Sequence, residues 1–422
     1  MLLWLPIAAA REPLSLLDAF FTATSAVCVT GLIVVDTSND LSMFGQSIVL
    51  LLIQAGGLGY MSITTVVAVA IGKQLTVHER LTLQEALNVQ TMDGLIRFVL
   101  NVFKLTLAFE IIGAVVLAAR WVGDMGVGRA LYLGLFHSVS AFNNAGFALF
   151  SDSLMGFRDD VVVNATILTL IVCGGLGFVV LTDLGRLRER RRLSVHTRLV
   201  LTTSAALIVG TTVALFVLEY RNPRTIGELS VPQGLLASLF QAVTPRTAGF
   251  NTLDIGAMTP ASLFLLMVLM FIGAAPGGTG GGIKITTFSI TVAALWATVR
   301  GAPDAVVFKR RLAPDLIARA FFISLIAFLA LNGVAALLLI TEGRGLLPTL
   351  FETVSAAGTV GLSTGEAGAP VSLVGHFSDA GKLLVIATMY MGRIGPLTLA
   401  VAIARGGTPP RVRYPEAKVL VG

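Results

Sequence analysis

Four short segments of the chain repeat one arrangement of polar residues and glycine. Each opens with Phe, carries Ser or Thr four residues later, and ends in Gly followed by a large apolar residue. Glycine adopts backbone torsions that side chains resist, so such loops can present carbonyl oxygens that replace the hydration shell of a cation. The predicted chemistry is coordination of a monovalent cation. The segments are Phe21–Leu32 (FTATSAVCVTGL), Phe136–Phe147 (FHSVSAFNNAGF), Phe240–Phe250 (FQAVTPRTAGF) and Phe351–Leu362 (FETVSAAGTVGL).

The closing glycines recur at intervals of about 110 residues, which indicates an internal repeat. A single glycine would be weak support, since glycines also pack helices in membranes, but four in matching positions favour a pore. We predict that the three residues ending at each closing glycine, which we call the filter segments, hold K⁺ at their carbonyl oxygens. The filter segments are Val29, Thr30 and Gly31; Asn144, Ala145 and Gly146; Thr247, Ala248 and Gly249; and Thr359, Val360 and Gly361.

The composition requires that most of the chain face lipid. Of its 422 residues, 55% are hydrophobic and 13% are charged, and the mean hydropathy is +0.85. A helix crosses the hydrocarbon layer with about 20 residues. Charge-free stretches predict spans at Leu41–Gly72, Val161–Thr182, Leu199–Leu218, Ile255–Ile283 and Ala320–Thr341, and two further spans with internal charges at Phe98–Ala119 and Leu383–Ala404.

These spans flank the filter segments, which predicts an all-α integral membrane protein. Four pseudo-repeated helix–pore loop–helix units would surround one central pore. Pro13, Pro232 and Pro348 lie near the start of short helices of about ten residues that enter the membrane and stop halfway, with their carbonyl ends toward its centre. The first helix should be incomplete, because only Met1–Ala10 precede Arg11. The expected bounds are 1–72, 97–184, 197–299 and 316–405, with a tail at 406–422.

The net charge of +6 comes from basic residues that cluster in short loops between spans. This pattern is typical of cytoplasmic loops and argues against nucleic-acid binding. We expect a multi-pass protein of the plasma or inner membrane, with the C-terminal ends of the second helices and the C-terminus in the cytoplasm. Cys28 and Cys173 give neither a disulfide framework nor metal spacing. The scattered histidines His78, His137, His196 and His376 favour a transporter or channel over a membrane-embedded enzyme.

One span contains a run of glycine and proline that a regular helix would not hold. Residues 273–282 read GAAPGGTGGG, so Ile255–Val299 should break into two helices joined by a mobile loop below the filter. A phosphate-binding loop is rejected, because Ile283 separates the last glycine from Lys284. We predict a gate at this glycine loop, formed by Gly277, Gly278, Thr279, Gly280, Gly281 and Gly282.

Two charged residues inside spans need an explanation. Arg393 has no carboxylate within one helical turn, so it either snorkels to the membrane surface or caps carbonyls, or it borders the pore as part of the gate. Glu110 has three open explanations: pairing with a neighbouring helix, packing polarity or a direct transport role.

The chain resembles a known family in several motifs. These are TSAVCVTGL, AFNNAGF, TPRTAGFNT and GTVGLST at the filter, GAAPGGTGGGIKITTF in the third unit and MGRIGPLT in the last span. They are similar to motifs in the membrane subunit of the Trk/Ktr/HKT superfamily of potassium transporters, and most of all to the Ktr membrane subunit.

The resemblance implies a homodimer whose single-chain pores are gated by a cytoplasmic ring of nucleotide-binding RCK subunits. ATP, ADP or NAD(H) would then bind only to that partner, and no cofactor to this chain. The basic stretch Arg186–Arg198 and the C-terminal tail are the expected contacts. The resemblance also places Arg393 below the filter. Gly31 argues for potassium, because sodium-selective members carry serine there; a sodium-permeable or sodium-coupled transporter of the same fold is the alternative. A receptor or scaffold without transport would leave the fourfold filter unexplained.

Overall fold

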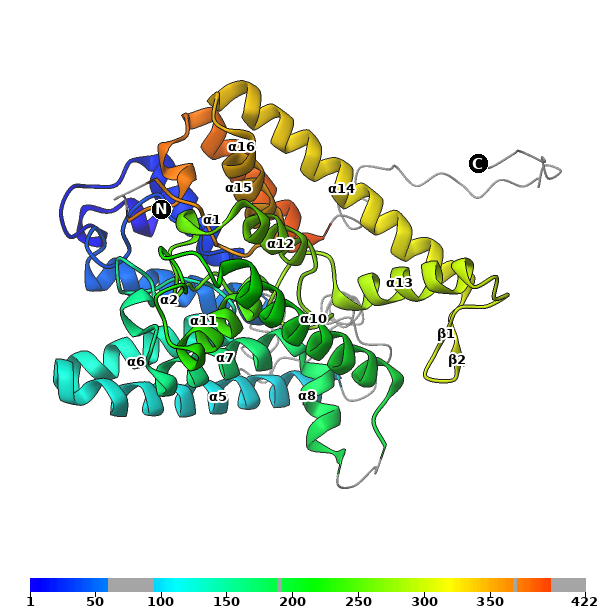
Figure 1. Cartoon of the computed structure of the whole chain (residues 1–422). Coiled ribbons are helices and arrows are strands. Elements are labelled where there is room, and N and C mark those ends of the chain that lie inside the picture. Colours follow the sequence, from blue (N-terminus) through cyan, green and yellow to red (C-terminus); the bar gives the residue numbers. More distant parts are fainter. Residues whose placement is uncertain (60–94, 188–191, 367–369, 396–422) are drawn as a thin grey trace.

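The computed structural model describes residues 1–59, 95–187, 192–366 and 370–395, and Figure 1 shows their arrangement. The described chain is mostly helical, as predicted, and its strands form one short hairpin. The second part of unit 1 at residues 60–72, the end of unit 4 at 396–405 and the tail at 406–422 lie outside the described residues.

Four short helices lead into the filter segments. They are α1 (Leu16–Val27), α6 (Val127–Phe142), α11 (Val231–Val243) and α15 (Leu346–Gly358). Local chemistry starts two of them: the Ser15 hydroxyl accepts the Asp18 amide, and Ser230 and Gln233 form a capping box around Pro232. With 12 to 16 residues each, these helices are too short to cross a membrane.

Three described helices are long and apolar enough to cross a membrane. They are α5 (Leu95–Met125), α10 (Val195–Glu219) and α14 (Pro314–Glu342), and each precedes one of the short helices. Ser194 caps the start of α10, and Gly343 ends α14 in a left-handed conformation with a φ of 60°. They contain the stretches that the sequence predicts as the first spans of units 2, 3 and 4.

The second helices are short: in unit 3 the break was predicted, whereas in the other three units the sequence predicted a longer span. These helices are α2 (Met43–Leu58), α7 (Val161–Leu176), α12 (Pro260–Phe271) and α16 (Asp379–Ile394). The predicted span at Val161–Thr182 is bent, because α7 and α8 (Phe178–Gly185) meet at an angle of 101°. Gly177 between them has a φ of 86°, which no right-handed helix holds. Gly59 and Gly395 end α2 and α16 in the same way, with φ values of 76° and 95°.

In unit 3 the glycine loop separates α12 from α13 (Ile285–Val299). An antiparallel hairpin of β1 (Val306–Val307) and β2 (Arg310–Arg311) then leads into α14. Short 3-10 turns complete the described chain: η1 (Leu2–Trp4), η2 (Pro6–Ala8), η3 (Met155–Phe157), η4 (Ile255–Ala257) and η5 (Leu373–His376). Residues 1–10 therefore form 3-10 turns around Pro6 rather than the piece of α-helix that the sequence suggests.

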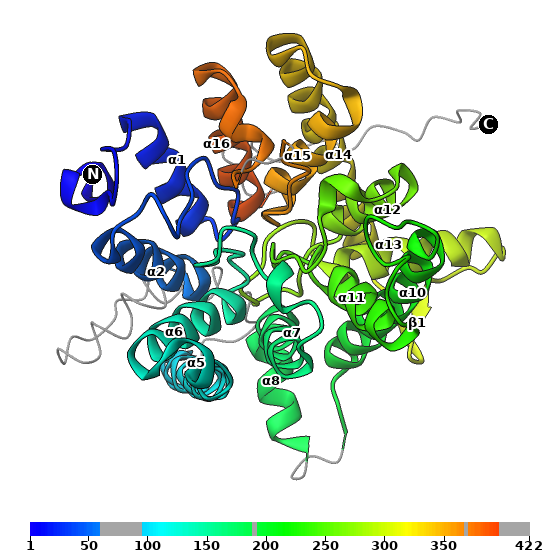
Figure 2. The same ribbon diagram turned by 60° about the vertical axis from the view of Figure 1, so that its left-hand side comes forward.

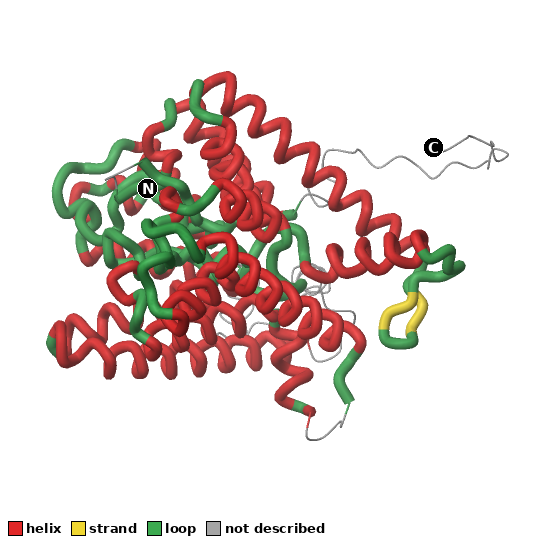
Figure 3. Tube along the Cα trace, viewed as in Figure 1, coloured by secondary structure: helices red, strands yellow, loops and turns green. Residues whose placement is uncertain are grey.

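The helices follow one another around a centre in chain order, as Figure 2 shows. Helix α2 contacts α6, α7 contacts α11, α12 contacts α15, and α1 contacts α16, which closes the circle. Loops rather than helices fill the middle, as the colours of Figure 3 show. The opening Phe of each repeated segment is fully buried and anchors its short helix: Phe21, Phe136, Phe240 and Phe351.

Candidate functional site

The four filter segments meet one another directly at their closing glycines. A Cβ added to Gly31 would lie 2.5 Å from the carbonyl oxygen of Ala145, and one added to Gly146 would lie 2.9 Å from that of Ala248. The next segment can approach this closely only because glycine has no side chain at each of these positions. The contacts form a closed ring: Gly31 with Ala145, Gly146 with Ala248, Gly249 with Val360, and Gly361 with Thr30.

All four segments share the same unusual backbone shape. The first residue of each lies in the left-handed region, where residues other than glycine are uncommon, and so does the closing glycine. Such torsions persist only where the surroundings impose them, and they are frequent at functional sites. The φ values are 54° at Val29, 57° at Asn144, 74° at Thr247 and 50° at Thr359, and 91°, 70°, 78° and 92° at Gly31, Gly146, Gly249 and Gly361.

The middle amide of each segment points back toward its short helix. Thr30 N donates to Ser25 O at 2.8 Å, and Ala145 N donates to Ser140 O at 2.8 Å. Ala248 and Val360 make the matching bonds to Thr244 and Ser355 at 2.9 and 2.8 Å. Within the described part of the chain, no hydrogen bond reaches the carbonyl oxygens of the filter segments. Free carbonyl oxygens at the C-terminal ends of four helices can coordinate a cation.

The repeated Ser or Thr of each segment ties the loop to the helix that precedes it. In two repeats its hydroxyl accepts an amide, as Ser25 does from Gly31 N at 3.1 Å. In the other two it donates to a carbonyl just past the glycine, as Ser140 does to Phe147 O at 2.8 Å. The hydroxyl thus holds the segment in place from behind, without being a ligand itself. Ser355 and Thr244 make the corresponding bonds to Gly361 and Phe250.

The glycine loop lies against the filter segments of units 3 and 4. A Cβ added to Gly280 would lie 3.1 Å from Thr247 Cβ, and one added to Gly281 would lie 3.1 Å from Thr359 Cγ2. Side chains at these loop positions would therefore collide with the first filter residues. Gly277 and Gly282 both have a φ of 67°, and Gly278 N donates to Ala275 O at 3.2 Å. The structure thus brings the predicted gate and the predicted filter together.

Arg393 reaches the same place from α16. Its guanidinium donates hydrogen bonds to the carbonyl oxygens of Thr279 and Gly56. Thr279 Oγ1 in turn donates to Phe142 O at 3.1 Å, at the end of α6. Arg393 therefore caps carbonyls, as one sequence interpretation expected, but these carbonyls belong to the predicted gate and to α2.

Sequence reasoning missed Lys284, which it considered only as part of a phosphate loop. Its Nζ donates to Gly280 O at 2.8 Å, so a second cation holds the glycine loop. The usable signal was a lysine two residues after the end of a glycine run, within an otherwise apolar span.

Another missed feature is the residue that follows the opening Phe of each segment. His137 Nε2 accepts from Leu149 N at 3.2 Å, and Glu352 Oε1 accepts from Val374 N at 3.0 Å. With its amide oriented to suit its neighbours, Gln241 accepts from Leu253 N at 3.1 Å. In these three repeats a buried polar side chain anchors the loop beyond the filter. The sequence contained a signal for this feature, because His137, Gln241 and Glu352 occupy the same position in three of the repeated segments.

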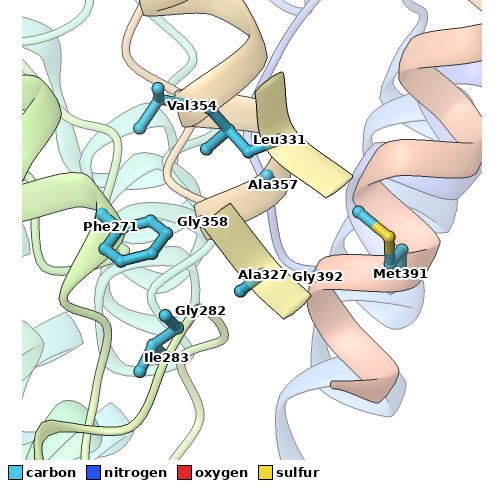
Figure 4. A pocket seen from close by; sticks show the side chains of 10 residues that line it. All are labelled: Phe271, Gly282, Ile283, Ala327, Leu331, Val354, Ala357, Gly358, Met391 and Gly392. Atoms are coloured by element: carbon cyan, nitrogen blue, oxygen red, sulfur yellow. The ribbon is translucent and has the colours of Figure 1, made fainter. Parts of the chain in front are cut away.

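A small apolar cavity adjoins the glycine loop, between α12, α14, α15 and α16 (Figure 4). Its volume is about 30 Å³. Phe271, Gly282 and Ile283 line one side, and Ala327 of α14 lines another. Because packed interiors deform little, the cavity marks a place where the packing around Gly282 and Ile283 is incomplete.

Comparison with known proteins gives consistent results. The TrkH family, described as a cation transport protein, matches residues 3–406. The chain is 42% identical to Ktr system potassium uptake protein B of Bacillus subtilis over 423 residues, which cover 100% of this chain and 93% of that protein. It is 34% identical to potassium/sodium uptake protein NtpJ of Enterococcus hirae, over 97% of this chain and 91% of that protein. The crystal structure of the potassium transporter TrkH from Vibrio parahaemolyticus matches 93% of this chain and 79% of its own with a TM-score of 0.74; at 21% identity this likeness concerns the fold.

Proposed function

The chain belongs to the TrkH family of cation transport proteins, and from that premise we propose that it takes up potassium through a pore lined by the four filter segments. Relatives at 42% and 40% identity are named potassium uptake proteins, which supports potassium as the cargo. The Enterococcus relative is named a potassium/sodium uptake protein, so a sodium-permeable or sodium-coupled pore is the second candidate.

The observation that carries this proposal is the closed ring of filter segments with free carbonyl oxygens. An unpaired carbonyl in hydrocarbon costs several kcal/mol. The carbonyl oxygens of the filter segments accept no hydrogen bond from the described residues, so they need a polar occupant on the axis. A dehydrated monovalent cation fits that need. The deciding experiment is uptake of potassium, rubidium and sodium, each in turn, into liposomes that hold the purified protein. Uptake of none of the three would contradict the proposal, and equal uptake of all three would favour the second candidate.

We propose further that the glycine loop and Arg393 form the gate. A fixed positive charge at ~6 Å from a cation, with an effective dielectric constant of 20, raises the energy of that cation by about 3 kcal/mol. This would slow conduction by about a hundredfold. The contacts of Arg393 with the loop and of the loop with Thr247 and Thr359 support a blocked state.

The remaining proposals concern partners. We propose that the chain forms a homodimer in the plasma membrane and that a cytoplasmic RCK-type subunit regulates it by binding nucleotide. Two relatives are named protein B of a Ktr system, and this name supports the presence of further protein components in such a system. Arg198 lies 4.3 Å from the ring centroid of Phe308, in the turn of the basic hairpin, so two basic segments adjoin on one surface. Co-purification from the native host tests this: failure to recover such a subunit would contradict it.

A further inference from the structure

Glu110 is a buried carboxylate in the middle of the membrane-crossing helix α5, and its side chain lies behind the filter segment of unit 2. The residue is 3% exposed. Its Oε1 accepts from Asn143 Nδ2 at 2.9 Å, and its Oε2 accepts from Gln54 Nε2 at 3.2 Å. Asn143 caps α6 and directly precedes Asn144, the first residue of the filter segment. Only one side chain therefore separates the carboxylate from the filter backbone.

The same cluster joins three helices. Asn143 Nδ2 also contacts Gln54 Oε1 at 2.9 Å, so α2, α5 and α6 share one set of hydrogen bonds. Ser138 Oγ donates to the backbone oxygen of Glu110 at 2.7 Å and fixes α5 against α6. A Cβ added to Gly57 would collide with the Asn143 side chain, so the amide has no room to turn away. The carboxylate is thus held close to the filter.

No basic side chain of the described residues pairs with the Glu110 carboxylate. Among the described residues, Glu110 takes part in no ion pair, and both of its hydrogen-bond donors are neutral amides. A buried carboxylate without a positive partner is strongly unfavourable, and such residues in membrane spans mark ion pathways. A cation at the neighbouring filter segment would supply the positive charge that none of the described side chains pairs with this carboxylate.

We propose that Glu110 is a positioning residue that sets the cation affinity of the filter, with the permeant cation as its counter-charge. The inference rests on the proposed function, because it needs a cation at the filter segments. A competing explanation is that Glu110 serves only as polar glue between helices, a common use of polar side chains in membranes. The two explanations differ in what removal of the charge alone would do.

The test compares Glu110→Gln, which keeps the shape and removes the charge, with the parent protein in liposome uptake of rubidium. We expect the half-saturating rubidium concentration to rise on the order of tenfold, as for one unit charge at ~10 Å and an effective dielectric constant of 20. The maximal rate should change less. Glu110→Asp keeps the charge and should stay within about twofold of the parent.

Glu219→Gln is the matched control. Glu219 is also a buried carboxylate, 1% exposed, at the end of α10. It accepts hydrogen bonds from Thr259 and Thr225, which do not adjoin a filter segment in the sequence. Its replacement should leave the half-saturating concentration unchanged. A folded Glu110→Gln protein with the parent's half-saturating concentration would overturn the inference. Failure of that variant to fold, or an equal rise in Glu110→Asp, would also count against it, because the fold would then depend on the residue's shape. Absence of uptake in the parent would instead contradict the proposed function.

Discussion

Arg393 donates a hydrogen bond to the backbone oxygen of Thr279, a residue 114 positions earlier in the chain. The same threonine bonds Phe142 O through its hydroxyl at 3.1 Å. The last helix, the glycine loop and the short helix of unit 2 are therefore connected in one path. A change at any point of this path should alter how firmly the loop rests below the filter.

Replacement of Thr279 by Val should loosen the loop. Valine keeps the shape of threonine but removes the hydroxyl that bonds Phe142 O. A net loss of about 1 kcal/mol per hydrogen bond predicts a rise in basal flux of about fivefold. Rubidium uptake into liposomes without any partner measures it. Thr291→Val is the control, because the Thr291 hydroxyl bonds Thr287 O within α13 alone. Equal flux in the parent and in Thr279→Val would rule out this bond as a latch.

Replacement of Gly31 by Ser should weaken the discrimination of potassium against sodium. The φ of 91° and the carbonyl oxygen 2.5 Å from a Cβ leave no room for a side chain. The serine would therefore displace the segment or its neighbour and change the spacing of the carbonyl oxygens. Permeability ratios from liposome flux test this, with Gly210→Ser as the control, since a Cβ at Gly210 meets nothing within 4 Å. An unchanged ratio in a folded protein would remove Gly31 from the filter.

Asp36 should make stability depend on pH. Burial raises the pKa of its carboxyl, but hydrogen bonds from Ser151, Ser38 and Asn39 lower the pKa by more, so it lies below the usual range. The ionised form is favoured by folding, so its contribution is present above the unfolded pKa of about 3.9 and is lost as the pH falls through the lower folded value.

Replacement of Asp36 by Asn should therefore reduce the free energy of unfolding at pH 7 by about 1–3 kcal/mol. The melting temperature should fall accordingly. The difference from the parent should shrink as the pH approaches about 3. Asp152→Asn, at an exposed position, is the control for a change of charge alone. A difference in melting temperature that stays constant across this pH range would contradict the assignment.

The sequence predicted what depends on local pattern and missed what depends on contacts between units. The short helices and their filter segments follow from one repeated motif, and Ser15 and Pro232 mark two of the helix starts. The bend at Gly177 depends on the approach of Pro276 O, which would lie 2.6 Å from a Cβ there. The run CGGLG indicates close packing or bending at Gly174, Gly175 and Gly177, but the approaching loop comes from another unit, so no local pattern identifies it.

The same limit applies to the candidate site. Matching positions in the repeats identified the filter segments, and the glycine run identified the loop. The contact of Glu110 with Asn143 and Gln54 joins three helices, and its partners are amides rather than a base. A search for charge complementarity along the sequence could not find it. The two consecutive asparagines Asn143 and Asn144 were the only local sign in the sequence that a polar cluster adjoins the filter.

The gate gives the last prediction. Deletion of Gly277 to Gly281 and the replacement Arg393→Gln should each raise basal flux, up to about a hundredfold for the loss of the charge. Glutamine retains hydrogen-bond donors, and Arg393→Lys retains the charge, so the lysine variant should stay near the parent if charge forms the barrier. Both changes release the same barrier, so their combined effect should be less than additive. Rubidium uptake with and without the proposed partner measures all of these variants. A folded loop-deletion protein whose flux remains low and still responds fully to the partner's nucleotide would exclude the glycine loop as the gate.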